Sequence, residues 1–240
     1  MCGRYLSPDQ AALEREGNLR VRHPFERIYN AAPTLALPVL RWSAAPAEGP
    51  AITTPDIAAF TPEREVLPMR WGLVPAWWSR PELPTSTINA RSEEAAVKPM
   101  WRDAVRRGRA LVPALGWYEW HVGASGKQPF FLHAADNSLL WFAGLWAARR
   151  DAEGNESLTF AILTRAASET VAPVHNRMPV VLPPPAQLDW LAPGTDKGSE
   201  RLAVAVASSR AEFAYYPVST YVNSPRNQGE RCIEPKQALL

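Results

Sequence analysis

Proline is the residue that most restricts how this chain can fold, because 24 prolines are distributed along its 240 residues. A proline inside a helix removes a backbone hydrogen bond and clashes with the preceding turn. Long helices are therefore disfavoured, and short strands joined by many turns are expected.

The helices that this pattern allows are short. We predict one that starts with Ser7 as its cap and ends at Gly17. A second, over residues 92–107, should be broken by Pro99, and a third should cover residues 184–191.

Short apolar or alternating runs predict a series of strands in the second half of the chain. They cover residues 110–114, 117–122, 129–134, 139–147, 158–164 and 178–182. Glycine-rich residues 123–127 predict a hairpin turn, and residues 151–155 a second turn.

An earlier run, residues 35–42, is predicted to be an edge strand because Pro38 cannot donate to a sheet hydrogen bond. Residues 43–56, rich in Ala, Pro and Thr, are expected to form a surface loop. No internal repeat or composition break divides the chain. The expectation is a single α+β domain of twisted, mostly antiparallel sheet with peripheral helices.

Arginine supplies nearly all of the positive charge: the chain has 22 arginines and four lysines at a net charge of +2. The planar guanidinium suits phosphate groups and stacks on rings, but an arginine excess also arises from a GC-rich genome. The 10 tryptophans leave two roles open as well, exposed stacking surfaces or ordinary core residues.

The two cysteines, Cys2 and Cys232, require no disulfide framework, and no signal peptide or membrane-spanning apolar run is apparent. We therefore expect a cytoplasmic protein in a reducing compartment. Three histidines, His23, His121 and His133, are scattered without metal-ligand spacing. With no phosphate-cradling glycine loop either, neither a metal nor another cofactor is expected.

Cys2 offers unusual chemistry if Met1 is removed, because an N-terminal cysteine carries an amine and a thiol on adjacent carbons. This 1,2-aminothiol condenses with an aldehyde to an imine, which the thiol closes to a thiazolidine. The amine, with an ordinary pKa of about 7.7–8.0 against about 8.5 for the thiol, should attack first. Taken alone, a cysteine at position 2 is weak evidence for this chemistry, since structural cysteines are usually inert.

Three other positions could support such chemistry. Asn89 and Arg91 share a face of an extended segment, where Asn89 could orient the N-terminus and Arg91 could bind phosphate; alternatively Asn89 caps the following helix. Glu119 lies among large aromatic residues, which would raise its pKa and suit proton transfer, unless an arginine pairs with it. His175 could move a proton near neutrality, with Arg177 reaching a phosphate, or it could be structural.

Seven motifs along almost the whole chain make it resemble the SRAP (SOS response-associated peptidase) family. They are Met1-Cys2-Gly3-Arg4-Tyr5, Tyr29-Asn30-Ala31-Ala32-Pro33-Thr34, Arg70-Trp71-Gly72-Leu73-Val74-Pro75-Ala76-Trp77-Trp78, Asn89-Ala90-Arg91-Ser92-Glu93, Trp117-Tyr118-Glu119-Trp120, His175-Asn176-Arg177-Met178-Pro179 and Val222-Asn223-Ser224-Pro225. The resemblance implies a barrel-like SRAP domain over residues 1–235, followed by a tail of residues 236–240.

The resemblance also implies a function: capture of abasic sites in single-stranded DNA as a covalent crosslink. The implied catalytic residues are Cys2, Asn89, Glu119 and His175. The implied DNA-binding residues are Arg4, Arg91, Arg177, Trp77, Trp78, Thr164 and Pro33. A cluster of Arg102, Arg106, Arg107 and Arg109 either extends this DNA surface or forms a solvated exterior.

Two other functions remain open on the sequence. One is an N-terminal-nucleophile peptidase or amidase in which the Cys2 thiolate attacks a carbonyl, including self-removal of Met1. The other is a non-covalent single-strand binder in which Cys2 is incidental. The interpretation we carry forward is a monomer that crosslinks abasic DNA, with lyase-type activity as a further expectation, and that associates with the nucleoid when bound to DNA.

Overall fold

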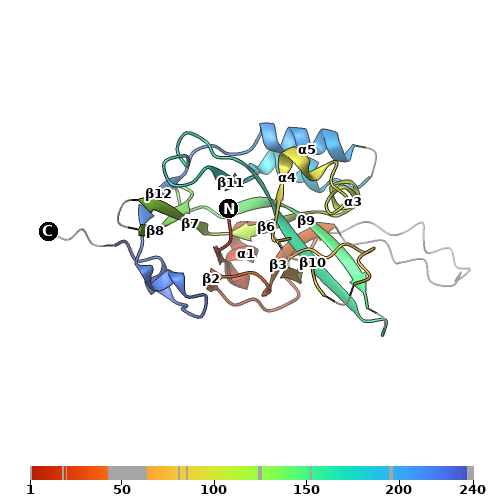
Figure 1. Ribbon diagram of the computed structural model, residues 1–240, viewed down its shortest axis with the longest axis horizontal. Helices are drawn as coiled ribbons and strands as arrows, with labels where there is room; N and C mark the ends of the chain where they lie inside the picture. Colours follow the sequence, from red (N-terminus) through yellow and green to blue (C-terminus); the bar gives the residue numbers. More distant parts are fainter. Residues whose placement is uncertain are drawn as a thin grey trace, which may run out of the picture.

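The computed structural model describes residues 2–17, 19, 21–42, 64–80, 82–84, 86–123, 126–151, 153–194 and 197–236. Five strands form a closed barrel, drawn in Figure 1: β3 (Ala36–Trp42), β4 (Arg64–Trp71), β6 (Arg109–Ala114), β9 (Leu140–Arg150) and β10 (Glu156–Ala166). Hydrogen bonding passes from β10 through β4, β3 and β6 to β9, and β9 pairs with β10 to close the ring. Only the β10–β4 pair of this ring is parallel, which confirms the expected mostly antiparallel, barrel-like α+β fold.

Two short strands add to β10 and carry predicted site residues. Strand β5 (Asn89–Arg91) pairs with it in parallel, and β11 (Arg177–Pro179) pairs antiparallel. A second, antiparallel sheet has the order β12 (Ala214–Pro217), β8 (Gly126–His133), β7 (Gly116–Gly123), β1 (Tyr5–Ser7) and β2 (Ile28–Ala31). Through β1 this sheet holds the start of the chain against β7, the strand of Glu119.

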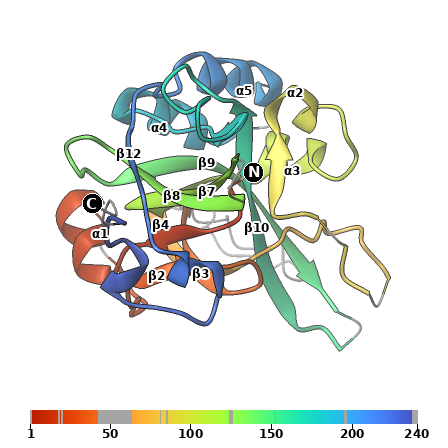
Figure 2. The same cartoon turned by 60° about the vertical axis from the view of Figure 1, so that its left-hand side comes forward.

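The helices cover the outside of the sheets. They are α1 (Gln10–Gly17), α2 (Ser92–Ala95), α3 (Arg102–Arg107), α4 (Pro184–Leu191) and α5 (Gly198–Ala207), with 3-10 turns η2 (Thr220–Asn223) and η3 (Glu230–Cys232). Figure 1 shows α4 and α5 together on one side of the barrel and the C-terminal part of the chain (blue) beside β2. In Figure 2, α2 continues from β5 next to β10.

An aromatic cluster fills the space between the two sheets. Tyr5 lies edge-on to Trp71 and Phe142, with ring centroids 5.2 Å and 6.2 Å away. Trp71 stacks on Phe160, and Trp117 meets Phe142 edge-on. All five side chains are buried, so these tryptophans are core residues, each contributing about 1.5–3 kcal/mol or more on burial.

The prediction that residues 35–42 form an edge strand is wrong, because β3 lies between β4 and β6. Pro38 is accommodated because it faces Pro68 of β4, another residue without an N–H. On the other side, the pairing with β6 is at Leu40, away from Pro38. The loop predicted for residues 43–56 falls outside the described residues.

Most of the other local predictions are confirmed, with shifted ends. Helix α4 has the predicted bounds, and the predicted helix over residues 92–107 is divided into α2 and α3 around Pro99. Strands β7 and β8 pair as a hairpin. The cap of α1 is a correction: the Asp9 carboxylate, not Ser7, accepts the N–H of Ala12 at 2.8 Å. Helix α5 was not predicted.

Arg109 is a second correction, because it is 6% exposed and cannot belong to a DNA-facing cluster. Its guanidinium donates five hydrogen bonds of 2.6–3.0 Å to carbonyls where α3 and α4 end and in the chain after α4: Val105, Arg106, Trp190, Ala192 and Gly194. Carbonyls at a helix C-terminus have no partner within the helix. Arg109 therefore satisfies the ends of two helices at once.

We expect Arg109→Met to lower the free energy of unfolding by about 3 kcal/mol or more, because it leaves several buried carbonyls without donors. Urea unfolding followed by circular dichroism measures the change. Arg102→Met is the matched control, since Arg102 is exposed and its nearest carboxylate is 4.0 Å away. A loss of stability for Arg109→Met no larger than the control's would contradict this role.

Candidate functional site

Cys2 and Asn89 meet in the interior. The Cys2 side chain is buried and packs in the same apolar cluster as Tyr5 and Trp117. Asn89, on β5, donates a 2.7 Å hydrogen bond from Nδ2 to the Cys2 carbonyl. It does not cap α2, whose cap position is Arg91. Asn89 thus fixes the backbone of Cys2, and its buried Oδ1, which has no hydrogen-bond partner among the described residues, can accept one from a ligand.

The Cys2 thiol is difficult to deprotonate in this environment. Burial raises its pKa well above the ordinary value, and the negative charge of Glu119 raises it further. At neutral pH the sulfur is therefore a neutral thiol.

Glu119 and His175 lie side by side. Glu119, on β7, is 2% exposed, and burial raises its pKa to about 7. Its Oε2 lies 3.9 Å from His175 Nε2. A carboxyl group with a pKa near neutrality can both give and take a proton under physiological conditions.

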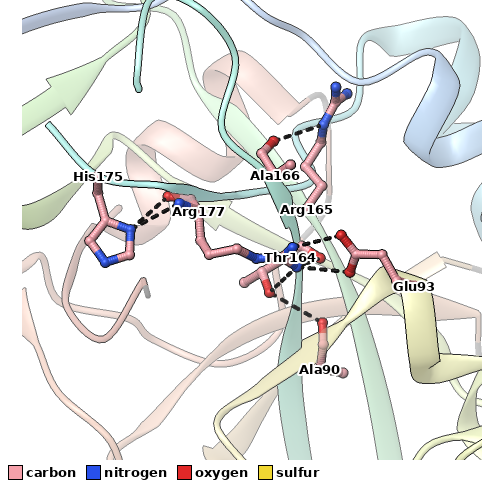
Figure 3. A network of polar contacts seen from close by, with 7 residues as sticks. All are labelled: Ala90, Glu93, Thr164, Arg165, Ala166, His175 and Arg177. Atoms are coloured by element: carbon pink, nitrogen blue, oxygen red, sulfur yellow. Dashed lines mark hydrogen bonds and ion pairs between the residues drawn. The ribbon is translucent and has the colours of Figure 1, made fainter. Parts of the chain in front are cut away.

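The tautomer of His175 follows from its backbone partner. Its Nδ1 lies 3.2 Å from the Arg177 carbonyl and accepts the backbone N–H of Arg177 at the shorter distance of 2.9 Å (Figure 3). With Nδ1 as an acceptor, the neutral ring carries its proton on Nε2, the nitrogen 3.9 Å from Glu119 Oε2. Burial lowers the pKa of His175 below its ordinary value. At neutral pH the ring is an uncharged donor directed towards the carboxylate.

The Arg177 side chain is already engaged. Its guanidinium makes a bidentate pair with Glu93 at 2.6 Å and 2.9 Å, and it donates to the Thr164 carbonyl at 2.7 Å (Figure 3). The hydrogen bonds from Arg177 lower the pKa of Glu93. Glu93 lies within the Asn89 motif but was not among the predicted site residues. A phosphate would have to compete with this carboxylate for Arg177.

Arg4 is engaged in a different way, with the C-terminal part of the chain. It donates to Asn30 Oδ1 at 2.8 Å and to the carbonyls of Val222 and Asn223 at 3.1 Å and 3.3 Å. Its guanidinium also lies 5.9 Å from the centre of the Trp120 ring.

The remaining predicted DNA-binding residues are spread over the surface and its edges. Arg91 is exposed, Pro33 is half-buried in the turn after β2, and Thr164 is buried on β10. Trp77, 51% exposed, lies on the loop after β4 against Trp78, whose Nε1–H is bound by the Glu82 carbonyl. These two tryptophans contact each other rather than the group around Cys2.

Among the described residues, no three side chains of the types that bind metals lie together as a possible metal site. None of the described helices is long and apolar enough to span a membrane.

The family model described as "SOS response associated peptidase (SRAP)" matches residues 1–225 of this chain. The abasic site processing protein YedK of Escherichia coli is 35% identical over 169 residues, covering 70% of this chain and 74% of that protein. The abasic site processing protein HMCES of Gallus gallus is 32% identical over 201 residues, covering 74% and 59%. A solved structure from Bacteroides thetaiotaomicron has the same fold, with a TM-score of 0.78 at 20% identity over 99% of this chain and 100% of that one.

Proposed function

The chain belongs to the SRAP family, and from that premise we propose that it captures abasic sites in single-stranded DNA as a thiazolidine crosslink through Cys2. The observation that carries the proposal is the convergence of three distant segments on Cys2. Asn89 holds its carbonyl, the negative charge of buried Glu119 acts on its thiol, and half-buried His175 lies 3.9 Å from Glu119. The name shared by the relatives, abasic site processing protein, supports the same substrate class.

The reaction needs Met1 to be removed, so that Cys2 carries the α-amine. The unprotonated amine adds to the C1′ aldehyde of the opened sugar and gives a carbinolamine. Protonation of its hydroxyl and loss of water give an iminium ion, whose nitrogen keeps its proton. The Cys2 sulfur then bonds to the iminium carbon, and the thiol proton replaces the one that left with the hydroxyl, so that the whole reaction releases one water molecule.

Proton transfer in these steps falls to Glu119 and His175. With a pKa of about 7, the Glu119 carboxyl can protonate the leaving hydroxyl and then accept the thiol proton. His175, with Nε2–H facing Glu119, can exchange a proton between this carboxyl group and the sugar oxygen. Asn89 Oδ1 is positioned to accept a hydrogen bond from the amine or the opened sugar.

DNA binding is assigned to the outer residues. Arg91 and Arg177 would bind phosphates beside the lesion, Arg177 in exchange for Glu93, with Thr164 and Pro33 at the edge of the site. Trp77 or Trp78 would stack on a base, a contact worth about 1–3 kcal/mol that tolerates any sequence. The peptidase alternative receives less support, because the raised pKa of the Cys2 thiol disfavours direct attack by a thiolate.

The test is a denaturing gel of untagged protein mixed with a single-stranded oligonucleotide that carries one abasic site. We expect a slow band that withstands denaturation, and none with a tetrahydrofuran analogue, which has no aldehyde. Mass spectrometry should show that the protein lacks Met1 and that the adduct has lost one water. Absence of the band, for protein of the mass expected without Met1, would reject crosslinking and leave the peptidase alternative.

A further inference from the structure

Arg4 lies two residues after Cys2, and its guanidinium is committed to the protein's own C-terminal segment, residues 219–233. One terminal nitrogen, NH1, donates to Asn30 Oδ1 and to the Val222 carbonyl, and the other, NH2, donates to the Asn223 carbonyl. Burial lowers the pKa of Arg4 from its ordinary value. An arginine binds a phosphate in a bidentate manner through its two terminal nitrogens. In Arg4 both of these nitrogens are already hydrogen-bonded.

Asn223 of the C-terminal segment also binds Trp120, the residue after Glu119. Trp120 Nε1–H donates to Asn223 Oδ1 at 2.8 Å. On the backbone, Tyr118 N–H donates to the Arg4 carbonyl at 3.0 Å. One connected set of hydrogen bonds, made by Arg4, Trp120 and Asn223, thus joins the residues next to Cys2 to the residues next to Glu119.

Asn30 secures the C-terminal segment to the same sheet. Its Nδ2 donates to the carbonyls of Val222, Ser224 and Asn227 at 3.0, 2.9 and 3.2 Å. Asn30 itself is buried on β2, which pairs with β1. The segment is therefore held by buried hydrogen bonds as well as by Arg4. The Val222–Pro225 motif had been given no role from the sequence.

We propose that Arg4 and Asn223 are positioning residues: through them the C-terminal segment sets the placement of Cys2 relative to Glu119, and Arg4 is not a phosphate ligand. The inference rests on the proposed crosslinking function. An error of about 1 Å in the placement of a reacting group can cost about 100-fold in rate. Such a loss appears in the reaction rate at saturating DNA rather than in affinity.

Two substitutions of Arg4, to methionine and to lysine, separate a positioning role from phosphate binding. Arg4→Met removes both the positive charge and the hydrogen bonds of the guanidinium. Arg4→Lys keeps a positive charge for a phosphate but cannot reproduce the three hydrogen bonds of the guanidinium. Asn223→Leu removes the acceptor for Trp120, whereas Asn223→Asp keeps it. Trp120→Phe removes only the donor and retains a ring, which covers the case in which the Arg4 variant fails to fold.

The experiment measures two quantities for each variant. One is the affinity for single-stranded DNA carrying the tetrahydrofuran analogue, over a range of salt concentrations. The other is the crosslinking rate at saturating abasic DNA, measured between about pH 5.5 and 9. This range extends to both sides of the pKa values of the groups proposed to transfer protons. Arg91→Met serves as the phosphate-ligand control and should reduce the salt slope by about 0.7.

We expect Arg4→Lys, Asn223→Leu and Trp120→Phe to lose about tenfold or more in saturated rate, with a shifted pH midpoint and an unchanged salt slope. Asn223→Asp should keep a rate close to the parent's. The proposal is overturned if Arg4→Lys crosslinks at the parental rate. It is also overturned if the salt slope of the affinity falls as much for Arg4→Met as it does for Arg91→Met. If the parent itself forms no crosslink, it is the proposed function that fails.

Discussion

Cys2→Ser is expected to eliminate the denaturation-resistant adduct with abasic DNA. A serine hydroxyl is a weaker nucleophile than a thiol, so an imine formed by the amine is not trapped as a stable ring. The reversible imine would survive only if it were reduced chemically before denaturation. Treatment with cyanoborohydride should therefore restore a band for Cys2→Ser, which separates amine attack from thiol trapping.

Cys232→Ser is the matched control, because Cys232, the other cysteine, lies within the C-terminal segment and is equally buried in an apolar cluster. It should crosslink at the parental rate. A variant with one alanine inserted between Met1 and Cys2 keeps the thiol but turns the Cys2 amine into an amide, so no thiazolidine can form and it should give no band without cyanoborohydride. A stable adduct from that variant would exclude the aminothiol mechanism.

Glu119→Gln is expected to lower the crosslinking rate by about 10²–10⁴-fold, the usual range for removal of a general acid–base group. The parent should show a bell-shaped pH profile. The amine gains its reactive form as the pH rises towards about 7.7–8.0, while Glu119 loses its proton above about 7. The variant should keep only the rising limb. Single-turnover rates from quenched gels measure both profiles.

The same substitution should make the protein more stable above neutral pH. The folded-state pKa of Glu119 is raised from 4.5 to about 7, so its contribution to stability is complete below pH 4.5 and is lost as the pH rises through about 7. Glutamine carries no such penalty. We expect Glu119→Gln to gain up to roughly 3 kcal/mol at pH 8 relative to the parent, and little at pH 4.

Glu94→Gln is the control for both measurements, because Glu94 lies on the surface and pairs with Lys98 one helical turn away. It should leave the pH profile of the rate unchanged. A falling limb near pH 7 that persists in Glu119→Gln would show that another group titrates there. Equal stability of parent and Glu119→Gln at pH 8 would contradict the raised pKa.

The sequence by itself predicted many of the local elements, though not β1, β2, β4, β12 or α5, and it identified most of the candidate site residues. Prolines and glycines divide the chain where α2, α3 and the β7–β8 hairpin begin or end, because their backbone restrictions act within a few residues. The motifs around Asn89, Glu119 and His175 were recognisable for the same reason, since each is contiguous. The structure places Asn89 against Cys2 and His175 beside Glu119, whose charge acts on the Cys2 thiol.

Only the tertiary structure decided which residues these side chains meet. Pro38 lies in a central strand because it faces Pro68, and Arg109 is buried because two helix ends converge on it. Arg4 and Val222 are 218 positions apart in the chain, and Arg177 and Glu93 are 84 apart. Such contacts depend on strand register and barrel closure, which are fixed by the packing of the whole core and leave no local signal in the sequence.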